Sequence, residues 1–292
     1  ANCVQTDAGD RSIRLETSVG TYDPLPYVVP GFATLLVSTN ATASLRAARL
    51  AGAALALVLL ALGASTGGGF WSRLGLFAAL TPGVLFVLGS VGANSLEIAG
   101  ACALSQALFR LCATGVATRR IGIAVAVGGF ATVASRPTSV AWLVAAAGVA
   151  AILHGRPREL VTLPGARVVG AAWFTGFALQ GRHVMALAVM APILAGTVMD
   201  ARGAPASRRL RWACAGVWAV TQVAYWLFNA HRNAVGTSGT WSFLDDQPAW
   251  LPGPWELWLA VIGAGAVVAA CALALSPVAV RSESARSWEK PA

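Results

Sequence analysis

A carboxylate and an amide lie close together in one of the most apolar stretches of the chain, LTPGVLFVLGSVGANSLEIAG at 80–100. Asn94 and Glu97 are three positions apart and would share one face of a helix. Because an ionised carboxylate at bilayer depth costs about 2.5–3.5 kcal/mol, Glu97 needs compensation. Two interpretations stay open: the two residues form a capping box at a helix start, or they face a wet outer cavity and offer hydrogen bonds there.

A second polar group stands directly before an apolar tract, in the sequence QGRHVMALAV. It consists of Gln180, Arg182 and His183. The planar, permanently charged guanidinium of Arg182 suits a phosphate group, and His183 could donate a second hydrogen bond. The alternative is that Arg182 only anchors the helix at the membrane interface, with its stem in the apolar layer.

A third polar group lies in the stretch 229–255, which we expect to be an outer loop. Its polar and aromatic residues include His231, Arg232, Trp241, Asp245, Asp246 and Trp250. An interfacial belt explains tryptophans at the loop ends, whereas the two inside the loop could hold the apolar faces of sugars. The adjacent aspartates could bind a divalent cation, although two carboxylates alone are a weak signal, and no other cofactor is indicated.

The composition is that of an integral membrane protein. Hydrophobic residues make up 57% of the chain and charged residues 11%, against about 45–50% and about 25% in soluble domains. The net charge of +9 comes from basic residues in short loops, where orientation signals belong, and no basic stripe with interleaved aromatics suggests nucleic-acid binding. The five cysteines form no CxxC pair, which gives no sign of a metal site.

The apolar tracts predict an all-α, polytopic bundle of about nine membrane helices. Strands with alternating faces are absent from the sequence, which argues against a barrel. The tracts run at 47–64, 73–90, 95–115, 121–135, 139–154, 163–180, 183–199, 212–228 and 256–277.

Loop arginines set the expected orientation, because positive charge favours the cytoplasmic side. This rule makes residues 1–46 an extracytoplasmic segment with a surface helix in 22–38, residues 47–280 the membrane domain, and residues 281–292 a cytoplasmic tail. The three polar groups then share the outer face of the plasma membrane. Arg46 and Arg49 lie there against the charge rule, as tolerated noise or as a site for an anion.

Several motifs together resemble a known family. LTPGVLFVLGSVGANSLEIAG, QGRHVMALAV and FNAHRNAVG with its following tryptophan and proline are similar to domain-of-unknown-function family 2142, a group of mainly actinobacterial multi-spanning proteins. That family is grouped with the GT-C membrane glycosyltransferases. The resemblance covers most of the chain, in order.

The resemblance implies a function. PLPYVVPGFATLL followed by SLRAARLAGA is similar to the surface helix and second membrane helix of GT-C enzymes that use polyprenyl-phosphate sugars. We therefore expect transfer of a sugar from such a lipid to a cell-envelope glycan acceptor, with Arg46 and Arg182 at the donor phosphate. Asn94 and Glu97 would hydrogen-bond to the sugar or acceptor, and the loop 229–255 would contact the acceptor. The family's acidic motif after its first membrane helix is not in this sequence, so the catalytic base is unknown.

Two further functions remain open. The same polar face could serve a lipid or polymer transporter, which discontinuous helices near the midplane and internal symmetry would favour. The chain could also be a non-catalytic scaffold of envelope assembly. Because the chain does not begin with methionine and starts with a polar segment, we expect a missing piece before Ala1. Compared with the family, the region near 164–175 is either missing a segment or abbreviated.

Overall fold

The computed structural model describes residues 24–37, 41–136, 139–153, 181–235, 239 and 254–277. Every regular element in those ranges is a helix, which confirms the predicted all-α class. The helices are α1 (Leu25–Leu35), α2 (Ala41–Thr66), α3 (Phe70–Ala79), α4 (Pro82–Leu88), α5 (Ala93–Thr114), α6 (Arg119–Val133), α7 (Val140–Leu153), α10 (Gly181–Ala188), α11 (Met190–Ala201), α12 (Arg208–Val235) and α13 (Trp255–Ala274).

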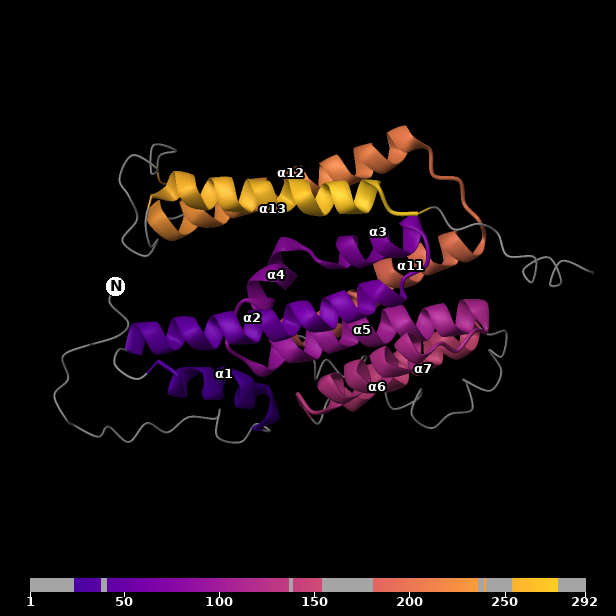
Figure 1. The fold of residues 1–292 in the computed structure, drawn as a ribbon, viewed down its shortest axis with the longest axis horizontal. Helices are drawn as coiled ribbons and strands as arrows, with labels where there is room; N and C mark the ends of the chain where they lie inside the picture. Colours follow the sequence, from indigo (N-terminus) through magenta and orange to yellow (C-terminus); the bar gives the residue numbers. More distant parts are fainter. Residues whose placement is uncertain are drawn as a thin grey trace, which may run out of the picture.

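Helix α5 is the centre of the bundle (Figure 1). It packs against α2, α4, α6, α7, α10 and α11, and every residue from Glu97 to Ala107 is buried. A helix that is buried on all sides belongs to the core and needs no amphipathic pattern. The small, apolar and polar residues of this helix therefore all contact neighbouring helices.

Small residues let the neighbours of α5 approach its backbone. A Cβ atom on Gly100 would lie 2.8 Å from Thr132 N and 2.9 Å from Gly128 O, both on α6. A Cβ atom on Gly63 of α2 would lie 2.9 Å from the Cα atom of Ala103. Such contacts are typical of helix pairs in membranes, where close van der Waals packing drives association.

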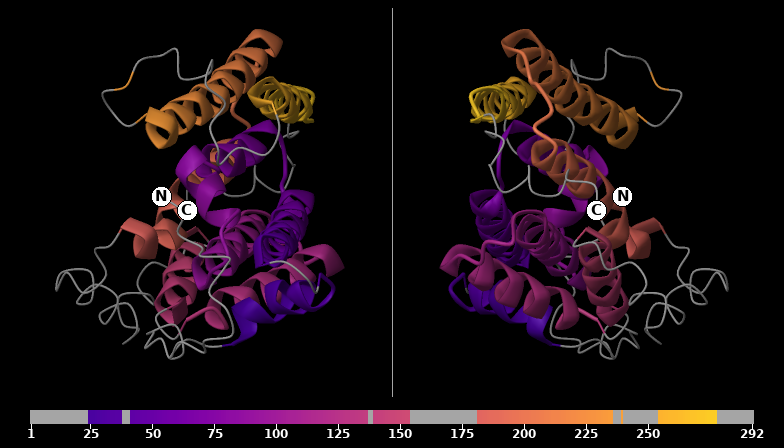
Figure 2. Two further views of the ribbon diagram at one scale, coloured as in Figure 1. Left: turned by 90° about the vertical axis from the view of Figure 1, so that its left-hand side faces the viewer. Right: turned by 90° about the vertical axis from the view of Figure 1, so that its right-hand side faces the viewer.

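The outer layers expose apolar side chains. The pair α12 and α13 forms a layer over α3 and α11, on the side opposite α6 and α7 (Figures 1 and 2). Large side chains such as Leu57 on α2, Val220 on α12, and Val267 and Val268 on α13 are exposed. Extended apolar surfaces of this kind fit a lipid surrounding.

Among the described helices, three are long and apolar enough to cross a membrane, namely α2, α5 and α13, and α3 with α4 would make a fourth span if counted together. Helices α6 and α7, with 15 and 14 residues, are shorter. The predicted tract 163–180 lies outside the described residues. The described helices coincide with most predicted tracts, but nine spans are not confirmed.

The tract 73–90, predicted as one span, is two helices. Helices α3 and α4 meet at a bend of 70°. Thr81 caps α4 by accepting a bond from Val84 N, and Pro82 occupies the first turn. Because proline has no N–H and restricts the residue before it, this pair ends α3 and starts a new helix.

Helix α12 holds the bend from the side. Trp218 Nε1 donates to Phe77 O at 2.9 Å, and Gln222 Nε2 donates to Leu80 O at 3.2 Å. The two donors are four residues apart on one face of α12. Carbonyl groups at a helix break in lipid need such partners, which explains the polar residues in this otherwise apolar helix.

Candidate functional site

Glu97 lies in the core and binds the start of α7. Its Oε1 atom accepts hydrogen bonds from Ser139 Oγ at 2.7 Å and from Trp142 Nε1 at 2.9 Å. The buried Arg136 also acts electrostatically on this carboxylate. The polar centre made by these four residues joins α5 to the segment between α6 and α7.

One sequence interpretation of Glu97, the capping box, is corrected by this geometry. The residue that caps α5 is Gly92, without a side-chain bond, so Asn94 already lies within the first turn. A capping box between Asn94 and Glu97 is therefore wrong. Glu97 is 1% exposed, and Ser139, Trp142 and Arg136 compensate for its burial. Its contact with a ligand stays a prediction.

Two acceptor atoms in this region have no hydrogen-bond donor. Glu97 Oε2 and Asn94 Oδ1 are both buried and unpaired among the described residues. Because more than about 90% of buried polar groups in proteins are hydrogen-bonded, unfilled acceptors mark a place for water or a ligand. The two atoms belong to side chains one turn apart on α5.

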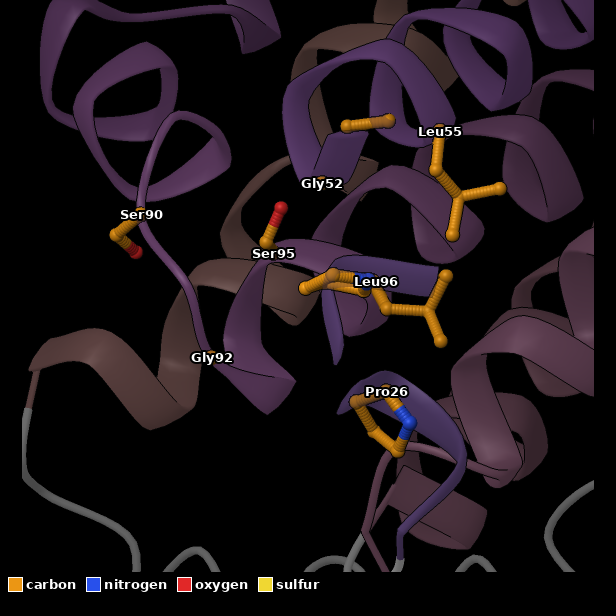
Figure 3. Close-up of a pocket in the computed structure, with 9 residues that line it drawn as sticks. Pro26, Gly52, Leu55, Ser90, Gly92, Ser95 and Leu96 are labelled. Atoms are coloured by element: carbon orange, nitrogen blue, oxygen red, sulfur yellow. The ribbon is translucent and has the colours of Figure 1, made fainter. Parts of the chain in front are cut away.

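A small pocket lies on the adjacent face of α5 (Figure 3). It is lined by Pro26, Pro30, Gly52, Leu55, Ala56, Ser90, Gly92, Ser95 and Leu96. Its volume of about 10 Å³ has room for about one water molecule. The hydroxyl groups of Ser90 and Ser95 donate to Val87 O and Leu88 O. The pocket lies between α1, α2 and α5, and its volume is too small for a sugar.

The other predicted site residues are spread over several helices. Arg46 is exposed near the start of α2, and Arg232 is exposed in the last turn of α12. Arg182 and His183 belong to the first turn of α10. Gln180 and Asp245 lie outside the described residues, and so do the side-chain positions of Arg182 and His183.

Contacts between helices determine which residues share an end of the bundle. Asp200, at the end of α11, accepts bonds from Gly69 N, Trp71 N and Ser72 N at the start of α3. Because α10 precedes α11 and packs against α5 and α7, it begins at the opposite end, where α5 begins. The first turn of α10, with Arg182, therefore lies at the same end as Glu97.

Helix α12 extends into the stretch predicted as the outer loop. Residues 229–235 continue α12 as helix, so His231 and Arg232 lie on it. His231 is buried, and its Nε2 atom is 3.0 Å from Gly239 O. The last turns of a membrane helix can be polar because they reach the interface. The change from apolar to polar residues near position 229 therefore did not mark the end of the helix.

Sequence reasoning missed three residues that matter in the structure. Ser139 and Trp142 were not recognised as partners of Glu97, although Trp142 is the lone aromatic residue in an aliphatic tract. Asp200 was also missed, although it is a lone acidic residue at the end of an apolar tract. Its three backbone bonds cap α3, which begins without a side-chain cap of its own.

No metal-binding cluster is present in the described part of the chain: no group of three or more histidine, cysteine, aspartate or glutamate residues occurs there. The adjacent pair Asp245 and Asp246 lies outside that part, so the divalent-cation site stays a prediction.

The apolar helices, their exposed apolar surfaces and the buried polar centre define an integral membrane protein built from helices. Residues 3–287 match the model of a family described as "Predicted membrane protein (DUF2142)". The chain belongs to this family, as its motifs predicted. No curated protein and no solved structure matches the chain, so the grouping with GT-C enzymes stays a prediction.

Proposed function

We propose that this membrane protein transfers a sugar from a polyprenyl-phosphate donor to a cell-envelope acceptor, at the end of the bundle where α5 begins. The observation that carries the proposal is the pair of unfilled acceptors, Glu97 Oε2 and Asn94 Oδ1. Both accept hydrogen bonds, as hydroxyl-rich ligands require, and they are held on one turn of a rigid, buried helix. A hydroxyl group can donate a hydrogen bond to each of these acceptors, and a sugar carries several such groups.

Arginines at the same end support an anionic donor. Arg46 lies in the second turn of α2 and Arg182 in the first turn of α10, and guanidinium groups bind phosphate through paired charge-assisted bonds. An exposed arginine at the outer end of a membrane helix contradicts the usual charge distribution, and phosphate binding would account for Arg46. This assignment makes the α5 start the extracytoplasmic side of the plasma membrane.

In the proposed reaction, the acceptor hydroxyl oxygen forms a bond to the anomeric carbon, and the bond from that carbon to the phosphate oxygen breaks. The hydroxyl proton passes to a base that is not assigned, and polyprenyl phosphate leaves. Glu97 is assigned a binding role: Oε1 accepts from Ser139 and Trp142, and Oε2 would accept a hydroxyl group of the ligand. Asn94 and Glu97 thus orient hydroxyl groups.

A lipid or polymer transporter is the second candidate. The bend of 70° between α3 and α4 is the observation that favours it, since transporters bind substrates at interrupted helices near the midplane. The bend is tied to α12 by Trp218 and Gln222. A transporter would move the lipid between leaflets without changing it chemically.

The experiment that tests the proposal supplies the complete protein with a polyprenyl-phosphate donor labelled in its sugar, and with cell-envelope glycan as acceptor. In detergent solution, an enzyme releases polyprenyl phosphate and moves the label to the glycan. We expect Glu97→Gln and Arg182→Ala to lower this rate at least about tenfold, the loss of one charge-assisted bond. Arg208→Ala, at the other end of the bundle, should leave it unchanged.

Two results would overturn the proposal. Full transfer activity in both site variants would remove these residues from the site. Absence of transfer, together with label movement across the bilayer of sealed vesicles, would establish the transporter. If the protein neither transfers nor moves the lipid but retains envelope-assembly proteins, it is a scaffold.

A further inference from the structure

A basic cleft lies at the opposite end of α5 from Glu97. It has a volume of about 510 Å³ and opens where α2 ends and α6 begins. Its lining residues are Ser65, Thr66, Gly67, Arg110, Thr118, Arg119, Arg120 and Ile121. Arg110 follows Glu97 by thirteen residues on the same helix, which is about 20 Å along the axis. The cleft is therefore separate from the proposed donor site.

The three arginines of the cleft have no acidic partner in the described part of the chain. The carboxylates of that part are Glu97, Asp200 and Glu256. Glu97 belongs to the other end, Asp200 binds the backbone of α3, and Glu256 begins α13. Three like charges around one cleft repel one another, and a bound anion would remove this cost.

Arg110 is held in the wall of the cleft by a glycine. A Cβ atom on Gly68 would lie 2.5 Å from Nη1 and 2.9 Å from Cζ of Arg110. The guanidinium group therefore covers the backbone of Gly68, and any larger residue would displace it. This contact positions the guanidinium group of Arg110 by packing. Its N–H donors stay available to a ligand.

The start of α6 adds neutral donors to the same cleft. Thr118 Oγ1 accepts a bond from Ile121 N at 3.3 Å, which leaves its hydroxyl hydrogen available to a ligand. The first N–H groups of the helix, from Arg119 and Arg120, have no partner within the helix, and the helix dipole is positive there. Charged and neutral donors thus converge on one volume.

We propose that this cleft binds a phosphate-bearing anion larger than phosphate itself. Guanidinium groups pair with phosphate oxygens through two parallel bonds, and Thr118 with the α6 start would bind the remaining oxygens. A volume of about 510 Å³ is within the range of small-molecule sites, about 300–1,000 Å³. The phosphate comes either from the headgroup of an anionic lipid or from a soluble phosphate compound.

The chain contains a matched control for this site. Helix α12 begins with Ser207, Arg208 and Arg209, the same pattern of a hydroxyl residue and two arginines as Thr118, Arg119 and Arg120. Ser207 Oγ accepts from Leu210 N at 3.2 Å, and both arginines are exposed. The two pairs are equal as orientation signals, but only the α6 pair lines the cleft.

The test uses the complete protein in phosphatidylcholine nanodiscs, with phosphatidylglycerol or inorganic pyrophosphate as the added probe. Native mass spectrometry measures which probe is retained and how tightly. We expect the double variant Arg119→Gln/Arg120→Gln to weaken binding at least about tenfold, because charge-assisted bonds are lost. The double variant Arg208→Gln/Arg209→Gln should stay within about twofold of the wild type.

A second variant separates geometry from charge. Gly68→Ala keeps every charge but displaces Arg110, and we expect it to weaken binding of the same probe. Gly216→Ala is the control, because its Cβ atom meets nothing within 4 Å, and it should leave binding unchanged. Retention of phosphatidylglycerol identifies a lipid headgroup site, and retention of pyrophosphate identifies a soluble ligand. Retention of neither probe, or equal losses in the two double variants, would overturn the proposal.

Discussion

Trp142 Nε1 donates a hydrogen bond of 2.9 Å to Glu97 Oε1 across 45 positions of sequence. The bond joins the start of α7 to the central helix and places an indole donor against a carboxylate that is 1% exposed. With Ser139 and Arg136, it explains how an acidic residue is tolerated in the apolar core. The remaining oxygen of Glu97 has no donor among the described residues, and the proposed ligand would supply one.

Removing the Glu97 carboxylate should destabilise the protein strongly. Glu97→Ala leaves the buried donors of Ser139 and Trp142 unpaired, and we expect a loss of about 3–5 kcal/mol in the free energy of unfolding. Glu97→Gln keeps an acceptor oxygen and should cost about 1–2 kcal/mol. Unfolding in detergent micelles measures both. Equal stability of Glu97→Ala and wild type would refute the role of this polar centre.

Asp200 should be as important to α3 as a local cap. Asp200→Ala removes the acceptor of three backbone N–H groups, and we expect a loss of about 2–3 kcal/mol. Asp200→Asn retains one acceptor oxygen and should lose less. Unfolding experiments give both values, and hydrogen exchange at residues 69–72 should rise. Unchanged exchange there would contradict the cap.

The contact between α3 and α11 should not accept a methyl group. Cβ atoms on Gly75 and Gly196 would collide with the backbone of Pro192 and Trp71 respectively. We expect Gly75→Ala and Gly196→Ala to cost about 1–3 kcal/mol each through overpacking. Gly216→Ala and Gly263→Ala are controls, since their Cβ atoms meet nothing within 4 Å. Similar effects in all four variants would contradict the packing.

The bend between α3 and α4 should depend on α12. Trp218→Phe and Gln222→Leu each remove the donor that reaches a carbonyl at the end of α3. We expect each variant to lower the free energy of unfolding by about 1–2 kcal/mol, measured by unfolding in detergent micelles. Thr221→Val is a control, because the Thr221 hydroxyl bonds only within α12, to Val217 O. A loss in the control as large as in the variants would show that the bend needs no support from α12.

Periodicity and composition predicted the helical class and the approximate positions of most helices, because long apolar tracts admit few other structures in lipid. They failed at Thr81 and Pro82, where one tract contains two helices. The polar signal of Thr-Pro was present in the sequence, but the length of the tract suggested a single span. The donors Trp218 and Gln222, which make the break tolerable, lie on another helix and are not readable from local sequence.

The candidate site was predicted only in part. A glutamate at position 97, inside an apolar tract, indicated a carboxylate that either binds a ligand or is compensated by neighbouring groups. Spacing within α5 could not reveal Ser139 and Trp142, because these contacts depend on how α7 packs against α5. The same limit applies to Asp200, whose partners precede it by about 130 positions.

The most direct test of the proposed function is mass spectrometry of the lipids that co-purify with the complete protein. We expect a polyprenyl phosphate or its sugar adduct with the wild type and with Arg208→Ala, and its loss in Arg182→Ala and Glu97→Gln preparations that remain folded. Bulk phospholipid alone in every preparation, or the same polyprenyl lipid in all four, would contradict a donor site at the start of α5.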